Sequence, residues 1–264
     1  LTGKILVSGA TGFLGRHVLT SLHENERCTP LALVRNVTGW RDQAWARELN
    51  RVDVLTGSVT RPDAWFDDKR LDGVTGILHL AAVVRHSRNE PYDIYQTNVE
   101  GTLNMVRLAA RKKCRMVFVS TSGTVGCFKS KSAWADENSA YCEDEVRDWP
   151  YYHSKILAER QARQLAKDLG VELVIMRPPV MLGPGDHRFR STGHIIKHLL
   201  RKLPFLLHGG IHFIDIRDAT NAIMAALKHD APRPIYHLSG TACSVVDFFD
   251  MIESVSGIPR PSPV

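Results

Sequence analysis

Apolar segments of strand length alternate with helical patterns along most of this 264-residue chain. The predicted strands are short and continuously apolar, and they span residues 4–8, 31–35, 52–56, 76–80, 115–120 and 171–177. Helical patterns separate them, among them residues 13–23, residues 92–112 and a stretch that ends near Leu169. Continuous apolar strands joined by helices are typical of a parallel sheet covered on both faces. The alternation therefore predicts an α/β fold built on a doubly wound parallel sheet.

The alternating pattern changes after Arg177. Residues 178–186 carry three prolines and two glycines and are predicted to be loop, and residues 193–210 are predicted to be one basic amphipathic helix. Strand and helix patterns then return, at residues 213–216, from Asp218, at 235–239 and at 245–255. We therefore expect a nucleotide-binding domain over residues 1–177. We expect a mixed region over residues 178–264, in which a small substrate-binding lobe accompanies returning α/β elements.

Composition excludes several classes of protein. Apolar residues make up 44% and charged residues 23%, as in ordinary soluble proteins. No apolar run reaches the roughly 18 residues of a membrane span. The five cysteines are scattered and odd in number, which favours a reduced, cytoplasmic compartment. The net charge of +6 comes without basic residues interleaved with aromatics, which argues against nucleic-acid binding. The 12 histidines show no metal-ligand spacing, so we expect no metal site.

A glycine-rich segment, SGATGFLG, follows the first predicted strand and opens the first predicted helix. Its glycines are Gly9, Gly12 and Gly15. The first can take a tight turn, the second lets the backbone approach a phosphate, and the third lets helix and strand pack closely. Amides at a helix N-terminus offer donors and a partial positive charge to a pyrophosphate. The position of this segment predicts a Rossmann-type dinucleotide site rather than a plain glycine-rich turn.

The residue at the end of the second predicted strand bears on the choice of dinucleotide. NAD sites commonly place an acidic residue about 20 residues past the glycines, where it accepts from the ribose 2′-hydroxyl. This sequence has Arg35 there. A guanidinium suits a 2′-phosphate and leaves a bare ribose without its acceptor. Arg35 therefore favours NADP over NAD, with a solvated strand end as the alternative interpretation.

Tyr151 and Lys155 form a candidate proton-transfer pair. They are four residues apart in a predicted helix and therefore lie on the same face. The side chain of an ordinary tyrosine has a pKa of about 10. An ammonium one helical turn away is expected to stabilise the phenolate and lower the pKa. Tyr151 would then act as general acid or base. A surface pair that arose by chance is the alternative, and the pair alone does not decide between the two.

Several further segments, taken with these features, resemble the extended short-chain dehydrogenase/reductase family. They are HLAA (79–82), NVEGTLNMVRLA (98–109), VFVSTSGTVG (117–126) and RPPVMLGPGD (177–186). The chain resembles most the branch that holds dihydroflavonol reductases and 3β-hydroxysteroid dehydrogenases, within the NAD-dependent epimerase/dehydratase superfamily. Dehydratases of this family follow the hydroxyl position with Asp-Glu, whereas Gly123 and Thr124 follow Ser122 here, so we do not expect dehydration.

The resemblance implies a Ser-Tyr-Lys catalytic site. In it Ser122 donates to the substrate oxygen, Tyr151 transfers the proton and Lys155 bonds the nicotinamide ribose, with Ser120 and Thr121 as alternatives to Ser122. Tyr152 is expected to serve packing. The implied cofactor contacts are Gly9, Thr11, Gly12, Phe13, Leu14, Gly15, Arg35, Ser58, Val59, Leu80, Ala81, Ala82, Asn98, Ser120, Tyr151, Lys155, Pro178 and Val180.

The substrate is less well defined by the sequence. The implied contacts are Arg85, Ser122 and Gly123. Arg85, His86 and Arg88 follow the HLAA turn and indicate either an anionic portion of the substrate or a solvated loop. The amphipathic helix predicted over residues 193–210 is expected to be a lid packed on the core; lining a pocket for an apolar chain, or resting on a membrane surface, are the alternatives.

The favoured function is an NADP-dependent oxidoreductase that reduces a bulky, partly apolar ketone or aldehyde, or oxidises the alcohol. A nucleotide-sugar epimerase that retains NAD is the first alternative. A redox sensor without catalysis and a reductase domain of a larger synthase acting on a carrier-bound thioester are the others. Because the chain starts at Leu1 and the family usually continues beyond Pro263, we expect part of a longer protein with a truncated substrate lobe. The resemblance also implies a homodimer.

Overall fold

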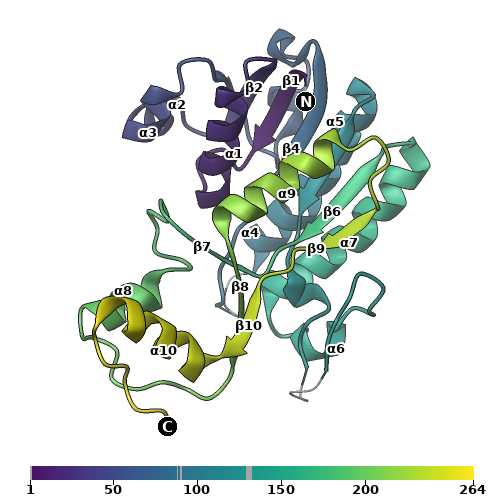
Figure 1. The fold of residues 1–264 in the computed structure, drawn as a ribbon. Helices are drawn as coiled ribbons and strands as arrows, with labels where there is room; N and C mark the ends of the chain where they lie inside the picture. The colour runs from purple at the N-terminus through teal and green to yellow at the C-terminus, as the bar shows by residue number, and fades with distance from the viewer. Residues whose placement is uncertain (1, 88, 90, 129–132) are drawn as a thin grey trace.

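A seven-stranded parallel sheet forms the centre of the molecule in the computed structural model (Figure 1). The structure describes residues 2–87, 89, 91–128 and 133–264. In spatial order the strands are β3 (Asp53–Thr56), β2 (Cys28–Val34), β1 (Gly3–Ser8), β4 (Val74–His79), β5 (Arg115–Val119), β6 (Leu173–Arg177) and β9 (Ile235–His237). The order reverses between β1 and β4, which is where ligands bind in open α/β sheets. The predicted Rossmann-type fold is confirmed.

Four long helices cover the two faces of the main sheet. On one face lie α1 (Phe13–Glu24) and α9 (Ile216–Lys228), and on the other α5 (Gly101–Lys112) and α7 (Pro150–Leu169). Their sequences place apolar residues every three or four positions, so each helix turns one stripe towards the sheet. Leu19 and Leu22 of α1, for example, are fully buried. Each such leucine contributes about 1.5–3 kcal/mol to folding.

The helix predicted over residues 92–112 is interrupted by a π-helical turn. It consists of α4 (Tyr92–Tyr95), the π-helical turn η3 (Gln96–Glu100) and α5. The turn holds the fully buried Asn98. Single π-helical turns inside helices frequently occur at functional sites. The local sequence pattern carries no sign of the turn, because the apolar spacing continues through it.

Short helical segments occupy the connections. The sequence analysis did not predict them. They are α2 (Val37–Arg41), α3 (Ala44–Glu48), α6 (Glu143–Val146) and the 3₁₀ turns η1 (Pro62–Ala64), η2 (Lys69–Leu71) and η4 (Ser122–Thr124). In the part of the chain that the structure describes, no helix has the length and apolar character needed to cross a bilayer.

A second, three-stranded sheet has the strand order β10–β8–β7. It comprises β7 (Val180–Leu182), β8 (Gly210–Asp215) and β10 (Thr241–Ser244). The prediction that residues 178–186 are all loop was wrong. Val180, Met181 and Leu182 pair in parallel with Phe213, Ile214 and Asp215. A partner some 30 residues further along the chain leaves no trace in the local, proline-rich sequence.

The prediction of a single helix over residues 193–210 was also wrong. Only Gly193–Leu199 is helical, as α8. Arg201 has a left-handed backbone with φ of 56°, which ends a right-handed helix, and Pro204 follows. Beyond α8, Leu206 packs with Phe248 and Phe249 of α10 (Val245–Ser256) in a small apolar cluster, and Leu203 lies against it. The apolar spacing of this segment therefore reflects tertiary packing of irregular backbone rather than one face of a helix.

Candidate active site

The turn between β1 and α1 is so tightly packed that only glycine fits at two positions. Gly9 has φ of +72°, and a Cβ there would lie 2.6 Å from the carbonyl carbon of Leu80. At Gly15 a Cβ would lie 2.3 Å from the carbonyl oxygen of Gly9. Real Cβ atoms do not approach backbone so closely. Glycine at position 9 therefore lets this turn pack directly against the end of β4. Glycine at position 15 lets the first turn of α1 pack against the carbonyl groups of the same β1–α1 turn.

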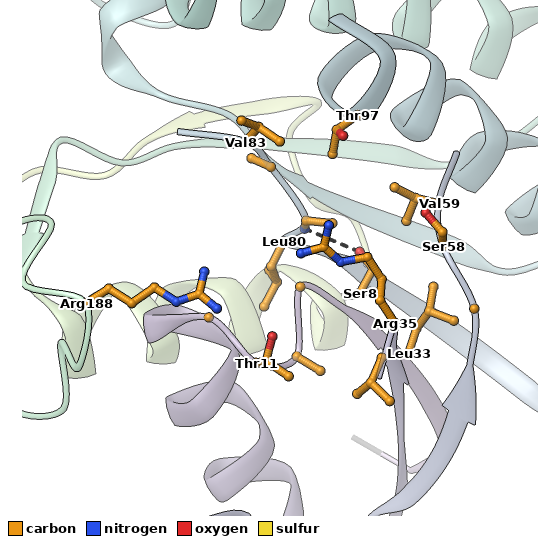
Figure 2. Close-up of a pocket in the computed structure, with 17 residues that line it drawn as sticks. Ser8, Thr11, Leu33, Arg35, Ser58, Val59, Leu80, Val83, Thr97 and Arg188 are labelled. Carbon is orange, nitrogen blue, oxygen red and sulfur yellow. Dashed lines mark hydrogen bonds between the residues drawn. The ribbon is translucent and has the colours of Figure 1, made fainter. Parts of the chain in front are cut away.

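A cavity opens above this turn, at the carboxyl ends of β1, β2 and β4 (Figure 2). It is lined by Ser8, Gly9, Ala10, Thr11, Gly12, Leu33, Val34, Arg35, Gly57, Ser58, Val59, Leu80, Ala81, Ala82, Val83, Thr97 and Arg188. Gly12 is the N-cap of α1 and no side chain caps the helix there; its first turn holds no acidic residue. The free N–H groups and the helix dipole thus remain available for an anion.

Residues at the far end of the cavity suit the adenosine half of a dinucleotide. Arg35 follows β2, is exposed, and turns its guanidinium over the cavity (Figure 2). Ser58 and Val59 line the same wall. The Ser58 hydroxyl lies 2.9 Å from that of Thr60, and the carbonyl of Ser58 accepts from the indole of Trp65. The glycine turn, the open helix N-terminus and this wall fit a dinucleotide laid across β1.

Tyr151 and Lys155 lie one turn apart near the start of α7, as predicted, but their electrostatics differ from the expectation. The pKa of Tyr151 is raised above its ordinary value by burial and by the neighbouring Tyr152, and a hydrogen bond with Thr121 lowers it only in part. Lys155 is buried, and its ammonium donates to the carbonyl oxygen of Val119 at 2.9 Å. Burial lowers the pKa of Lys155 to about 8, against a partial rise from Glu159.

The expectation that Lys155 lowers the pKa of Tyr151 was therefore wrong for this structure. The ammonium is directed at β5, where it also lies 4.8 Å from the centre of the Phe118 ring. The surroundings of the Tyr151 hydroxyl are dominated by burial. The phenol is protonated at neutral pH, as an ordinary tyrosine is, and burial makes its phenolate harder to form.

The neighbouring hydroxyl that lowers the pKa of Tyr151 is that of Thr121, whereas the sequence analysis favoured Ser122. The Thr121 hydroxyl also accepts from the backbone N–H of Gly123. Ser122 donates its backbone N–H to the carbonyl of Pro178 at 2.9 Å. Ser120 is buried, and its hydroxyl has no hydrogen-bond partner among the described residues. Ser122, Ser120 and Thr121 are adjacent, so sequence alone separates them poorly.

Asn98 joins the cavity wall to the helix that carries Tyr151. Its side-chain oxygen accepts from the backbone N–H of Val83 at 2.8 Å, and its amide donates to the Val83 carbonyl at 3.2 Å and to the Ser154 hydroxyl at 2.9 Å. Ser154 in turn donates to the carbonyl oxygen of Tyr151 at 2.7 Å. Asn98 thus holds the loop after β4 in a fixed position relative to the first turn of α7. This is a positioning role, exerted through neighbours.

A buried histidine that the sequence analysis did not single out completes this arrangement. His79 lies between Ser8, at 2.7 Å from Nδ1, and Thr102, at 3.0 Å from Nε2. The Thr102 hydroxyl donates to the carbonyl of Asn98 at 2.6 Å, so it must accept from Nε2–H of His79. Burial, and the charge of Lys155, lower the pKa of His79 to about 3 and keep it neutral. The chain of bonds links β1, β4 and the π-helical turn.

The other predicted site residues fall into two groups. Gly9, Thr11, Gly12, Arg35, Ser58, Val59, Leu80, Ala81 and Ala82 line the cavity, whereas Phe13, Leu14, Gly15, Asn98, Ser120, Tyr151, Lys155, Pro178 and Val180 are not among its lining residues. Leu14 is a core residue. Thr97 and Arg188, which do line it, were missed. Thr97 adjoins a recognised motif, but no periodicity or motif marks Arg188.

Residues near the predicted substrate side gather around the two tyrosines. The His86 ring lies 5.7 Å from that of Tyr151 and 5.8 Å from that of Tyr152. Arg85 is paired with Asp93 at 2.6 Å. Gly123 is closely covered by Tyr152, since a Cβ there would lie 2.4 Å from its ring. Tyr152 packs in an apolar cluster with Cys142 and Ile156, in line with its predicted packing role. Arg88 lies outside the described residues.

Comparisons with known proteins agree with this architecture. The model of the NAD dependent epimerase/dehydratase family matches residues 5–239. A putative dihydroflavonol 4-reductase of Synechocystis sp. is 26% identical, over 97% of this chain and 73% of its own length. The dihydroflavonol 4-reductase of Callistephus chinensis is 28% identical over 68% of this chain, and the match spans 52% of that enzyme. The chain thus spans about half the length of this plant relative.

Solved structures show the same fold. A protein named gox2253 superposes with a TM-score of 0.85 and 26% identity, over 98% of this chain and 77% of that one. UDP-glucose 4-epimerase of Thermotoga maritima, solved with UDP-glucose, superposes with a TM-score of 0.83 and 20% identity, over 99% and 85% of the two chains. The predicted resemblance is confirmed, and the chain is an NAD(P)-dependent enzyme of the short-chain dehydrogenase/reductase type. It belongs to the NAD-dependent epimerase/dehydratase family.

Proposed function

We propose that this chain binds NADP(H) and reduces the carbonyl group of a bulky, partly apolar ketone or aldehyde, or oxidises the corresponding alcohol. The observation that carries the proposal is the state of Tyr151. Tyr151 is protonated at neutral pH, like any tyrosine, and Thr121 partly offsets the rise in its pKa that burial causes. Through Ser154 and Asn98 it is tied to Val83 in the wall of the dinucleotide cavity. A protonated phenol beside a dinucleotide is the donor that carbonyl reduction needs.

The choice of NADP rests on Arg35. Arg35 lines the cavity, and no carboxylate is among the residues that line it in the described chain. A 2′-phosphate would gain charge-assisted hydrogen bonds from the guanidinium, whereas the ribose 2′-hydroxyl of NAD would find no carboxylate to accept from it. Epimerase neighbours crystallised with NAD share the fold at less than 25% identity, for example UDP-glucuronic acid 4-epimerase of Bacillus cereus at 23%. They carry no argument about this cofactor.

The proposed chemistry divides between cofactor and protein. The nicotinamide, when bound, supplies or accepts the hydride. Tyr151 donates its hydroxyl proton to the carbonyl oxygen as that oxygen gains charge, and Thr121 stabilises the phenolate that remains through its hydrogen bond. Lys155, whose ammonium donates to the Val119 carbonyl, would bond the nicotinamide ribose when the cofactor is bound. Asn98 and His79 hold the turn and the cavity wall in position without contacting the reacting atoms.

The substrate side is proposed to lie between α7 and the second sheet. His86 lies beside Tyr151, and the buried cluster of Leu206, Phe248 and Phe249 supports α10 in the C-terminal part of the chain. Relatives named dihydroflavonol 4-reductase suggest a planar, bulky substrate of this kind. We propose that α8, α10 and the second sheet form the substrate-binding lobe.

The test is turnover by matched tyrosine variants. Purified protein is mixed with NADPH and a panel of bulky aromatic and alicyclic ketones and aldehydes, and loss of NADPH absorbance is followed. Tyr151→Phe should lower kcat by at least about a hundredfold, since positioned proton transfer contributes about 10²–10⁴-fold. Its affinity for NADPH should not change. Tyr152→Phe is the control and should retain turnover.

Two results would contradict the proposal. Full activity in Tyr151→Phe would remove this residue from the chemistry. A protein purified with tightly held NAD, inert towards added NADPH but able to interconvert nucleotide-sugar epimers, would show the epimerase alternative to be correct.

A further inference from the structure

The loop between β7 and α8 is fastened to the helix that begins at the glycine turn. The His17 ring lies with Nε2 2.8 Å from the carbonyl oxygen of Pro184. Gly185 approaches α1 so closely that a Cβ there would lie 2.8 Å from a guanidinium nitrogen of Arg16. These contacts join residues that are more than 160 positions apart in sequence. They fix where the loop enters the neighbourhood of the dinucleotide cavity.

The same loop is given a defined shape by Asp186. This carboxylate is buried, and it accepts from the backbone N–H groups of Arg190, Ser191 and Thr192 at 3.3, 2.9 and 3.0 Å, as well as from the Thr192 hydroxyl at 3.0 Å. Four hydrogen bonds to one buried carboxylate hold residues 186–192 as a closed turn. Arg188 stands within that turn and is exposed.

Arg188 reaches the cavity from the side opposite Arg35. Figure 2 shows its side chain extending from the loop towards the glycine turn, while Arg35 enters from the end of β2. Among the described residues that line the cavity, Arg188 is the one that comes from beyond Thr97. No carboxylate of the described chain pairs with its guanidinium. A cation that forms no ion pair with the described residues thus faces the N-terminus of α1 across the cavity.

We propose that Arg188, held in the loop of residues 183–192, binds the pyrophosphate of the dinucleotide. The helix N-terminus supplies amide donors and a partial positive charge to one side of a pyrophosphate. A guanidinium on the other side offers a planar fork of donors that matches phosphate oxygens. The proposal rests on the proposed function in taking this cavity as the dinucleotide site. It is independent of the preference for NADP, because both dinucleotides carry the pyrophosphate.

The two arginines are proposed to bind different parts of the cofactor, Arg188 the pyrophosphate and Arg35 the 2′-phosphate, and this makes the test specific. Dissociation constants for NADPH and for NADH are measured by fluorescence titration of wild-type protein, Arg188→Gln, Arg188→Lys and Arg35→Gln. Arg188→Gln should weaken both cofactors by the same factor, about tenfold or more, as expected for a lost hydrogen bond to a charged group. Arg188→Lys should fall between wild type and Arg188→Gln, since it keeps the charge but loses the fork. Arg35→Gln should weaken NADPH alone.

Arg190→Gln is the matched control, since Arg190 lies in the same loop, is exposed and does not line the cavity. It should leave both constants unchanged. Because Arg188 is exposed, its variants should keep the melting temperature of the wild type, which excludes misfolding as the cause.

Unchanged constants in Arg188→Gln would overturn the proposal, and so would a loss confined to NADPH, which would move Arg188 to the 2′-phosphate. If Arg188→Gln weakens both cofactors while Arg35→Gln weakens neither, the pyrophosphate contact stands and the NADP preference fails. A wild-type protein that binds neither cofactor would overturn both proposals.

Discussion

The buried ion pair between Glu159 and Arg177 should be the most sensitive point of the fold around the site. Glu159 is 0% exposed and Arg177 2%. Nε of the guanidinium lies 3.1 Å and Nη2 2.6 Å from one carboxylate oxygen. The pair ties α7, which carries Tyr151 and Lys155, to β6. Its removal by one-sided substitution would leave a charge buried without its partner.

We expect Arg177→Met to lower the free energy of unfolding by about 3 kcal/mol. Breaking a buried pair typically costs about 3–5 kcal/mol. The lower end applies here because Tyr141 and Thr124 still donate to Glu159, at 3.1 and 3.2 Å. For a chain of this size, about 2–4 °C per kcal/mol gives a fall in Tm of roughly 6–12 °C. Urea unfolding and thermal melts measure both quantities.

The exposed ion pair of Arg147 and Asp144 is the control for this loss. Arg147→Met should cost less than about 0.5 kcal/mol. A deficit in Arg177→Met no larger than that of this control would refute the reasoning.

Three further predictions follow from the site. Gly15→Ala should lower stability by about 1–3 kcal/mol in urea unfolding, because its Cβ would overlap the Gly9 carbonyl, and a neutral effect would contradict that packing. Thr121→Val should lower kcat more than Ser122→Ala does, since Thr121 is the neighbouring hydroxyl that lowers the pKa of Tyr151. The reverse order would restore Ser122 as the active hydroxyl. The rate should also fall as pH rises through about 8, where buried Lys155 loses its proton. Lys155→Met should lack this limb of the pH–rate profile. If the limb persists in the variant, it belongs to another group.

Features with a local sequence signature were predictable, and features made by distant contacts were not. The parallel sheet follows from apolar strands that alternate with helices, and the turn at Gly9–Gly15 from glycine spacing that the packing requires. β7 exists only because β8 lies beside it, so no local pattern indicates it. Arg188 reaches the cavity through an ordered loop held by Asp186, an arrangement that depends on three-dimensional folding.

The chemistry of the site shows the same division. The four-residue spacing of Tyr151 and Lys155 correctly predicted a shared turn of α7. It gave the wrong sign for the pKa of Tyr151, because burial and the direction of the Lys155 ammonium towards Val119 depend on the packing of α7 against β5. Ser122 and Thr121 differ by one position in a loop, and the backbone turn η4 decides which hydroxyl contacts Tyr151. Residue type and spacing indicate a site, whereas packing sets its protonation.

The most direct test of the proposed preference for NADP is a titration of the purified wild-type protein with NADPH and, separately, with NADH at one fixed ionic strength. Fluorescence reports binding of each. On the proposed contact between Arg35 and the 2′-phosphate, NADPH should bind at least about tenfold more tightly than NADH. Equal or tighter binding of NADH, or a site already filled by NAD that does not exchange, would contradict the role of Arg35 and favour the epimerase.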